Sequence, residues 1–216
     1  MTNVKVVTGY IPIKDFPRSA EEYGECGEKL RAIKAPVQPF YGNVTSTWLY
    51  QMVEALPFFP TWAVADNRKK NTLAYHCVQH QKFQWLYEAS RMDQDADTFV
   101  WLDYGMIGYV PGVTAAVINE CLDRIKPDDL AIPGCWPVGE INDAFPCWRF
   151  CGGFMVVPRE AVQPLKNLIQ AVVMLHVNVT KRITFEVNSL ARAEQTGKVP
   201  IRWYQADHNE TMFTGY

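Results

Sequence analysis

An isolated aspartate ends one strongly apolar segment of this chain. Residues 98–106 read TFVWLDYGM, so a short run rich in β-branched and aromatic residues ends at Asp103 and is followed by Gly105. Such a run is typical of a buried strand. Asp103 can simply cap the next turn. It can also hold a metal ion or a sugar hydroxyl, because ligands of open α/β sheets bind beyond the carboxyl ends of the strands.

Further polar and small residues follow two other apolar segments, and the same argument places them near Asp103 if all the strands are parallel. They are Thr8, Gly9 and Tyr10 after residues 4–7, and Asp66 and Arg68 after residues 61–65. Carboxylates suit a ribose or a metal, and cations suit a diphosphate. Each of these residues, considered alone, is more often a helix cap or a turn residue. Their convergence predicts a nucleotide-binding crevice, to which Lys82 could add a second cation from a long helix.

The histidines and cysteines offer weaker signals. His76 and His80 have the i, i+4 spacing of zinc ligands on a helix, but both fall on its packing face and have no evident third ligand. We therefore interpret them as core residues. Cys147 and Cys151 have no recognisable ligand spacing. A thiol nucleophile at Cys151 with His208 as its base is conceivable, and only the residue types favour it.

Composition limits the class of protein. The 216 residues are 48% hydrophobic and 20% charged, which suits one globular domain over residues 1–216. The net charge of −2 gives no electrostatic reason to expect a nucleic-acid partner. No apolar run approaches the roughly 20 residues of a transmembrane segment. The N-terminus lacks a signal-peptide pattern and the six cysteines have no repeated spacing, so we expect a cytoplasmic protein with reduced thiols.

Hydrophobic periodicity predicts strands that alternate with helices. The expected strands cover residues 4–7, 36–41, 61–65, 98–102, 130–132, 148–157 and 201–204. The expected helices cover residues 19–33, 47–56, 72–92, 114–125, 158–176 and 185–194, and Ser19 with Glu22 forms a capping box for the first. This alternation predicts an α/β fold with a mostly parallel sheet covered on both faces.

Several short motifs occur in a fixed order along the chain. They are VTGY at residues 7–10, FVWLDYG at 99–105, CGGF at 151–154, VPRE at 157–160, EVN at 186–188 and ADHNE at 206–210. The ordered set resembles the HtrL/YibB group of bacterial proteins, which look like glycosyltransferases of the GT-A fold. The resemblance implies a GT-A-like (Rossmann-like) sheet. It also implies transfer of a sugar from a UDP- or GDP-sugar donor to an acceptor hydroxyl, in surface glycan synthesis.

The resemblance also implies a metal site, from which this sequence departs. GT-A enzymes carry an Asp-x-Asp motif after a central strand, where it binds Mn²⁺ or Mg²⁺ together with the donor diphosphate. Asp103 stands at that place, but Gly105 replaces the second aspartate. Similar folds often add a histidine near the C-terminal end, and His208 is the candidate. The alternative is a metal-independent enzyme in which Arg68 or Lys82 neutralises the leaving diphosphate.

The remaining site residues follow from the same resemblance. Similar folds place an acidic residue at a helix start near Glu186, which makes Glu186 a candidate general base and Asp207 a second one. An ordinary carboxylate stabilised by the helix dipole is the alternative for Glu186. Gly152 and Gly153 would let the backbone approach the donor sugar closely.

Two other functions stay open. The first is a catalytically silent protein of the same fold that binds a nucleotide-sugar or a glycan. The presence of Gly105 in place of the second aspartate favours this alternative. The second is a hydrolase that uses Cys151 or the pair of His76 and His80.

Overall fold

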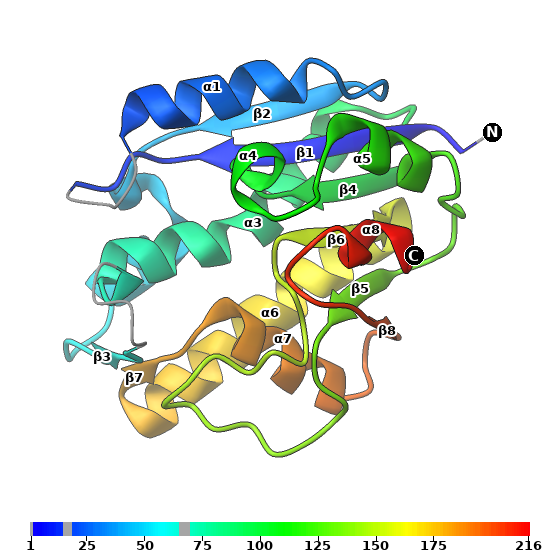
Figure 1. The fold of residues 1–216 in the computed structure, drawn as a ribbon. Coiled ribbons are helices and arrows are strands. Elements are labelled where there is room, and N and C mark those ends of the chain that lie inside the picture. Colours follow the sequence, from blue (N-terminus) through cyan, green and yellow to red (C-terminus); the bar gives the residue numbers. More distant parts are fainter. Residues whose placement is uncertain (1, 15–18, 65–69) are drawn as a thin grey trace.

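The structure is a computed structural model that describes residues 2–14, 19–64 and 70–216 (Figure 1). Its strands are β1 (Val4–Tyr10), β2 (Val37–Tyr41), β3 (Thr61–Trp62), β4 (Thr98–Leu102), β5 (Ala131–Gly134), β6 (Phe154–Pro158), β7 (Arg182–Ile183) and β8 (Arg202–Gln205). Its helices are α1 (Ala20–Leu30), α2 (Trp48–Glu54), α3 (Leu73–Met92), α4 (Met106–Tyr109), α5 (Ala115–Leu122), α6 (Arg159–Thr180), α7 (Glu186–Gln195) and α8 (Thr211–Thr214), with a 3-10 turn, η1 (Val44–Ser46).

Six strands form the main sheet in the order β2-β1-β4-β6-β5-β8. The pairs β1–β2, β1–β4 and β5–β8 are parallel, whereas β6 runs antiparallel to both of its neighbours. This arrangement confirms the predicted α/β fold with a mostly parallel sheet. A separate parallel pair joins β3 to β7.

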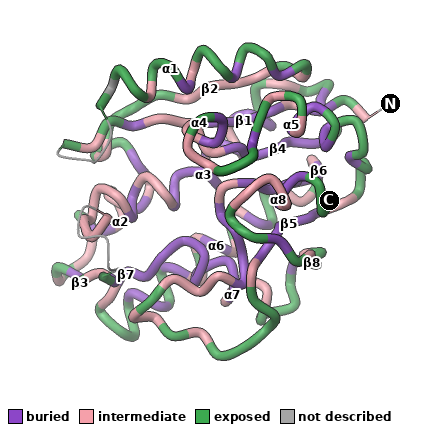
Figure 2. Tube along the Cα trace, viewed as in Figure 1, coloured by how far each residue is buried: buried purple, intermediate pink, exposed green. Residues whose placement is uncertain are grey.

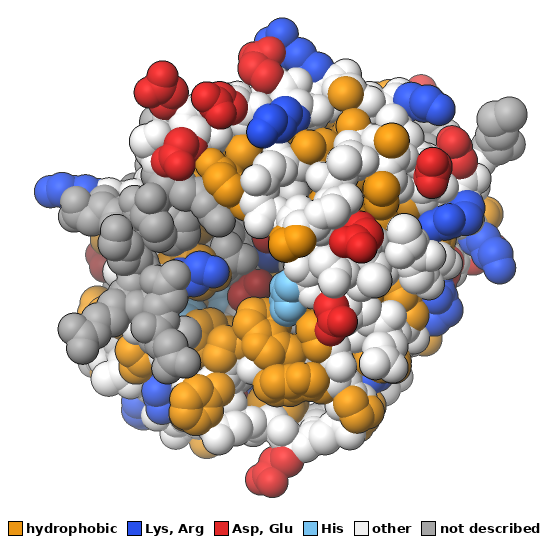
Figure 3. Space-filling view, in the orientation of Figure 1, with side chains coloured by type: hydrophobic (Ala, Val, Ile, Leu, Met, Phe, Trp, Pro, Cys, Tyr) orange, Lys and Arg blue, Asp and Glu red, His pale blue; other side chains and the backbone are white. Residues whose placement is uncertain are grey.

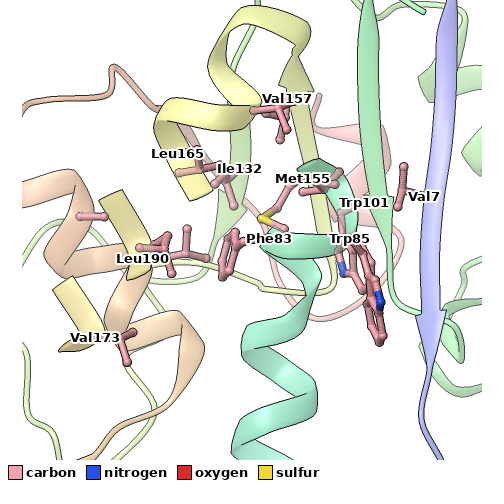
Figure 4. Packing of buried hydrophobic residues seen from close by; sticks show 14 of the residues in the cluster. Val7, Phe83, Trp85, Trp101, Ile132, Met155, Val157, Leu165, Val173 and Leu190 are labelled. Atoms are coloured by element: carbon pink, nitrogen blue, oxygen red, sulfur yellow. The ribbon is translucent and has the colours of Figure 1, made fainter. Parts of the chain in front are cut away.

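Alternating side chains of the strands pack on opposite faces of the sheet. Val7 and Trp101 belong to the core beneath α2, α3, α6 and α7, whereas Val6 and Val100 belong to the core beneath α1, α5 and α8. Helices therefore cover both faces, and β4, β5 and β6 are buried along their whole length (Figure 2). Figure 4 shows one of these cores, with Phe83 of α3 close to Met155 of β6.

Local signals in the sequence set the helix starts. The Ser19 hydroxyl accepts the Glu22 N–H at 3.1 Å, and the Glu22 carboxylate accepts the Ser19 N–H at 2.7 Å, which confirms the predicted capping box. Thr72 caps α3 in the same way by accepting the Tyr75 N–H at 3.1 Å. Among the described residues, no helix combines the length and the apolar composition that crossing a bilayer requires.

Three expectations about the strands were wrong. The first strand does not end before Thr8 but continues to Tyr10, because β2 stays paired with it as far as Tyr41. The expected strand over 148–157 starts only at Phe154, since residues 152 and 153 form a turn. The strand expected over residues 61–65 ends at Trp62 and belongs to the separate pair with β7, so it is not a strand of the main sheet.

The strand directions decide what meets at one edge. Because β1, β4, β5 and β8 point the same way, their carboxyl ends lie along one edge of the sheet. The antiparallel strand β6 begins at that edge, where Phe154 pairs with Leu102. The end of β4 is therefore held next to the turn that precedes β6.

Candidate functional site

A pocket of about 300 Å³ opens at this edge of the sheet. Aromatic and polar side chains form most of its wall. The aromatic ones are Tyr10, Tyr23, Tyr75, Trp85, Trp101, Tyr104, Tyr109 and Trp148, and the polar ones are Lys70, Gln79, Lys82, Asp103, Glu186 and His208. Figure 3 shows a hollow in the surface where acidic and histidine atoms lie beside hydrophobic side chains. Aromatic walls with a few convergent charges are typical of small-molecule sites.

Most of the site residues expected from the sequence line this pocket. They are Gly9, Tyr10, Lys82, Asp103, Gly152, Gly153, Glu186 and His208. Thr8 does not line it: the side chain is fully buried inside β1, because the strand continues past this residue. Asp207 is exposed and is also not part of the wall. Asp66 and Arg68 lie outside the described residues.

Lys82 is the centre of the polar contacts in the pocket. Its side chain is only 1% exposed, and its ammonium donates to the carbonyl oxygen of Gly152 at 2.7 Å and to Oε1 of Gln79 at 3.2 Å. The same nitrogen lies 3.4 Å from Oε1 of Glu186 and 3.5 Å from Oδ1 of Asp103. One buried cation therefore holds two carboxylates that are far apart in the sequence.

Hydrogen bonds to Gly153 and from Trp101 hold Asp103 in place. Its backbone N–H donates to the carbonyl oxygen of Gly153 at 2.9 Å, which ties the end of β4 to the turn before β6. Its Oδ1 accepts the indole N–H of Trp101 at 2.7 Å. The side chain is still 39% exposed, so the carboxylate remains accessible from the pocket. Asp103 thus combines a fixed position with access to a ligand.

Glu186 is the first residue of α7, where the helix dipole stabilises a negative charge. It is 8% exposed and lines the pocket. The absence of a side chain at Gly152 makes room for it, because a Cβ there would lie 2.6 Å from Oε1 of Glu186 and 3.3 Å from Nζ of Lys82. The space at Gly152 is therefore filled by the ion pair of Lys82 and Glu186. A close approach of the backbone at Gly152 and Gly153 to a donor sugar stays a prediction.

We predict that Gly152→Ala destabilises the protein. The new methyl group forces Glu186 or Lys82 out of position, and overpacking of this kind costs about 1–3 kcal/mol. Urea unfolding measures the change. Gly24→Ala is the matched control, because a Cβ there meets no atom within 4 Å and alanine favours the interior of α1. Equal stability of the two variants would contradict the arrangement described here.

The donor set around Asp103 does not fit a resident Mn²⁺ or Mg²⁺ ion. Oδ1 of Asp103 already accepts the Trp101 N–H and faces the ammonium of Lys82, which would repel a second cation. His208, the expected second ligand, places Nδ1 3.5 Å from the sulfur of Cys135. In the described part of the chain, no group of three histidine, cysteine or acidic ligand atoms forms at Asp103. Dependence on a divalent ion stays a prediction for experiment.

His76 and His80 are core residues, as we interpreted them. Nε2 of His76 contacts the carbonyl oxygen of Ala63 at 3.1 Å, and Nε2 of His80 contacts the hydroxyl of Ser189 at 3.1 Å. Both imidazoles are buried, and burial lowers the pKa of His80 to about 3. Neutral, hydrogen-bonded rings of this kind do not form the zinc pair of a hydrolase.

The geometry does not support a Cys151 nucleophile with His208 as its base. Cys135, and not Cys151, is the thiol that contacts Nδ1 of His208, while Cys151 is fully buried. Burial raises the pKa of both thiols, and partial desolvation of its ring lowers the pKa of His208. A protonated thiol beside a neutral imidazole is a poor nucleophile at neutral pH.

The tyrosines of the pocket wall other than Tyr10 were not predicted from the sequence. Tyr10 and Tyr104 are stacked with ring centroids 5.4 Å apart, and Tyr23 lies 4.7 Å from Tyr10. Tyr104 directly follows Asp103 in the sequence, and this position could have indicated that it lies in the pocket wall. Tyr23 comes from α1 and has no such signal, because only the packing of α1 over the sheet brings it to the pocket.

Comparisons with known proteins complete the description. No protein-family model and no curated protein matches this chain. A solved glycosyltransferase involved in the glycosylation of the major capsid of PBCV-1 is similar over 94% of this chain and 81% of its own, with 12% identity and a TM-score of 0.49. The apo form of mouse xyloside xylosyltransferase 1 is similar over 94% and 84%, with 10% identity and a TM-score of 0.46.

Proposed function

We propose that this protein is a glycosyltransferase, which moves a sugar from a nucleotide-sugar donor to an acceptor hydroxyl in the pocket. The convergence of Asp103, Lys82 and Glu186 under aromatic walls at the carboxyl edge of the sheet carries this proposal. Ligands of open α/β sheets bind at this edge. Aromatic rings pack against the faces of sugars and bases, and an accessible carboxylate such as Asp103 accepts hydrogen bonds from hydroxyl groups.

Cations in the pocket favour a donor that leaves as a diphosphate. Negative charge develops on the leaving group, and positive groups placed beside it lower the barrier. Lys70 supplies a positive charge in the wall of the pocket, and Lys82 supplies a second one in its floor, where it is shared with Glu186 and Asp103. We assign both to the neutralisation of the diphosphate.

Glu186 takes the role of general base in this proposal. A base must reach the acceptor hydroxyl directly or through one water, and Glu186 lines the pocket whereas Asp207 does not. Lys82 and the start of α7 hold its carboxylate in one place. The carboxylate accepts the hydroxyl proton as the acceptor oxygen attacks the sugar and the nucleoside diphosphate departs.

The ordered motifs that resemble the HtrL/YibB group support the same assignment. Asp103, Gly152 and Glu186 come from three different motifs, and all three line one pocket. We therefore extend the proposal to a UDP- or GDP-sugar donor and to an acceptor in a surface glycan. The alternative is a silent nucleotide-sugar or glycan-binding protein of the same fold, which the pairing of Glu186 with Lys82 favours.

We predict that nucleotide binding depends on Asp103. Isothermal titration of UDP and of GDP, each with and without Mn²⁺, should show binding of one nucleotide to the wild type. Asp103→Asn should weaken that binding by about 10- to 100-fold, the value of one hydrogen bond to a charged group. Asp128→Asn is the matched control, because Asp128 is exposed and lies outside this pocket.

The outcomes separate the two functions. Binding together with hydrolysis or transfer of the donor supports a glycosyltransferase, and binding without turnover supports the silent protein. Binding only in the presence of Mn²⁺ would confirm the metal dependence expected from the resemblance. Failure of both nucleotides to bind would reject a UDP- or GDP-sugar donor.

A further inference from the structure

Two cysteines and a histidine meet beside the pocket although they are distant in sequence. Cys135 follows β5, Cys151 lies just before the turn that leads into β6, and His208 follows β8. Their ligand atoms all lie within 4.8 Å of one another. Sulfur and imidazole nitrogen are the ligands that soft and borderline cations prefer in proteins.

The separations of these atoms match a tetrahedral zinc site. The two sulfurs are 3.6 Å apart, and the sulfur of Cys135 is 3.5 Å from Nδ1 of His208. Zinc–sulfur bonds of about 2.3 Å and a zinc–nitrogen bond of about 2.0 Å at tetrahedral angles would place the same pairs about 3.8 Å and about 3.5 Å apart. The third pair, Cys151 and His208, has its ligand atoms within 4.8 Å of each other.

The surrounding backbone holds both sulfurs in this position. The N–H of Cys135 donates to the carbonyl oxygen of Trp148 at 2.9 Å, and the N–H of Cys151 donates to that of Pro133 at 2.7 Å. Gly134 allows the two segments to lie so close, because a Cβ there would be 1.7 Å from the carbonyl oxygen of Arg149. The two thiols are therefore fixed on the framework of the fold before any ligand arrives.

The third ligand is also oriented, and it remains accessible. The ring of His208 packs edge-on against that of Trp148 with centroids 4.4 Å apart. His208 is exposed, so a cation can enter from the pocket side. Its Nδ1 faces the sulfur of Cys135 and is therefore directed at the position that a shared cation would take.

We propose that Cys135, Cys151 and His208 bind a Zn²⁺ ion. Both sulfurs bind as thiolates and release their protons to solvent, the imidazole binds as a neutral ligand, and water completes the tetrahedron. The ion joins the turn that holds Gly152 and the segment after β8 to the end of β5. It thus fixes the wall of the pocket, and the proposal stands whether or not the chain transfers a sugar.

The test is metal binding by the whole chain. The purified protein is stripped with a chelator, and Zn²⁺ and Co²⁺ are titrated into it separately. We expect one ion per chain, a higher unfolding temperature with Zn²⁺, and thiolate-to-cobalt charge-transfer bands with Co²⁺. Cys135→Ser and His208→Ala should each weaken zinc binding by at least about 100-fold. Cys147→Ser should change nothing, because Cys147 is a half-buried cysteine outside the cluster.

Each result decides the proposal. Lack of zinc uptake by the folded wild type would overturn it and leave a group of hydrogen-bonded thiols. A disulfide between Cys135 and Cys151, located by mass spectrometry of peptides from the protein purified without reductant, would overturn it too. His208→Ala keeps the test valid if the cysteine variants do not fold, because His208 is exposed.

Discussion

Lys82→Met will destabilise the protein by about 3 kcal/mol, because it leaves the buried carboxylate of Glu186 without its cation. The carbonyl oxygen of Gly152 also loses the 2.7 Å hydrogen bond from the ammonium. The expected cost lies at the lower end of the range for broken buried pairs, since Asp103 is 39% exposed and regains water. Urea unfolding at neutral pH measures the loss.

A second substitution identifies the cause of this loss. Adding Glu186→Gln to Lys82→Met removes the unpaired charge, and we expect it to recover about 1–2 kcal/mol. Lys34→Met is the control for the loss of a lysine, because Lys34 is exposed and does not line the pocket. If the double variant is no more stable than Lys82→Met, the ion pair is not what Lys82 contributes to folding.

The parts of the fold that were predicted correctly depend on local patterns. The apolar run before Asp103 forms β4, and the expected helices at residues 72–92 and 185–194 agree with α3 and α7 within a residue. Caps such as Ser19 and Thr72 act on backbone groups only three residues away. Parallel strands all end at the same edge of a sheet. The prediction of a mostly parallel sheet therefore also predicted the edge at which Asp103 lies with the ends of other strands.

The contacts that make the site could not be predicted in this way, because they join residues far apart in the sequence. Lys82 reaches Gly152 and Glu186 only because α3 packs against both the turn before β6 and the start of α7. Periodicity places Lys82 on a helix and carries no information on which distant carboxylate it meets. The group of Cys135, Cys151 and His208 has no motif spacing for the same reason.

The direction of β6 shows a second limit. Its apolar sequence was expected to form a strand, but nothing in it indicates that this strand runs against its neighbours. That direction places Gly152 and Gly153, at the start of β6, beside Asp103 at the end of β4. In a wholly parallel sheet, the starts and ends of strands lie at opposite edges, and the Lys82 contacts to Gly152 and Asp103 would not form together.

Glu186→Gln should lower the rate of sugar transfer by about 10²–10⁴-fold while nucleotide binding changes little. The amide has the size of the carboxylate and cannot accept the acceptor proton, so a general base is lost and the shape of the pocket is kept. Rates at saturating donor concentration, together with titration of the nucleotide that binds the wild type, measure the two effects separately. Asp103→Asn should show the reverse, with the larger loss in nucleotide binding.

Asp207→Asn decides between the two acidic candidates. Asp207 is exposed and does not line the pocket, so its variant should keep the wild-type rate within about threefold, as is usual for an exposed polar group that makes no contact with substrate. A large loss of rate in Asp207→Asn with little loss in Glu186→Gln would assign the base to Asp207. The acceptor hydroxyl would then have to bind next to the segment after β8, because Asp207 does not line the pocket itself. Glu186 needs no such movement, since its carboxylate already lines the pocket beside Lys82.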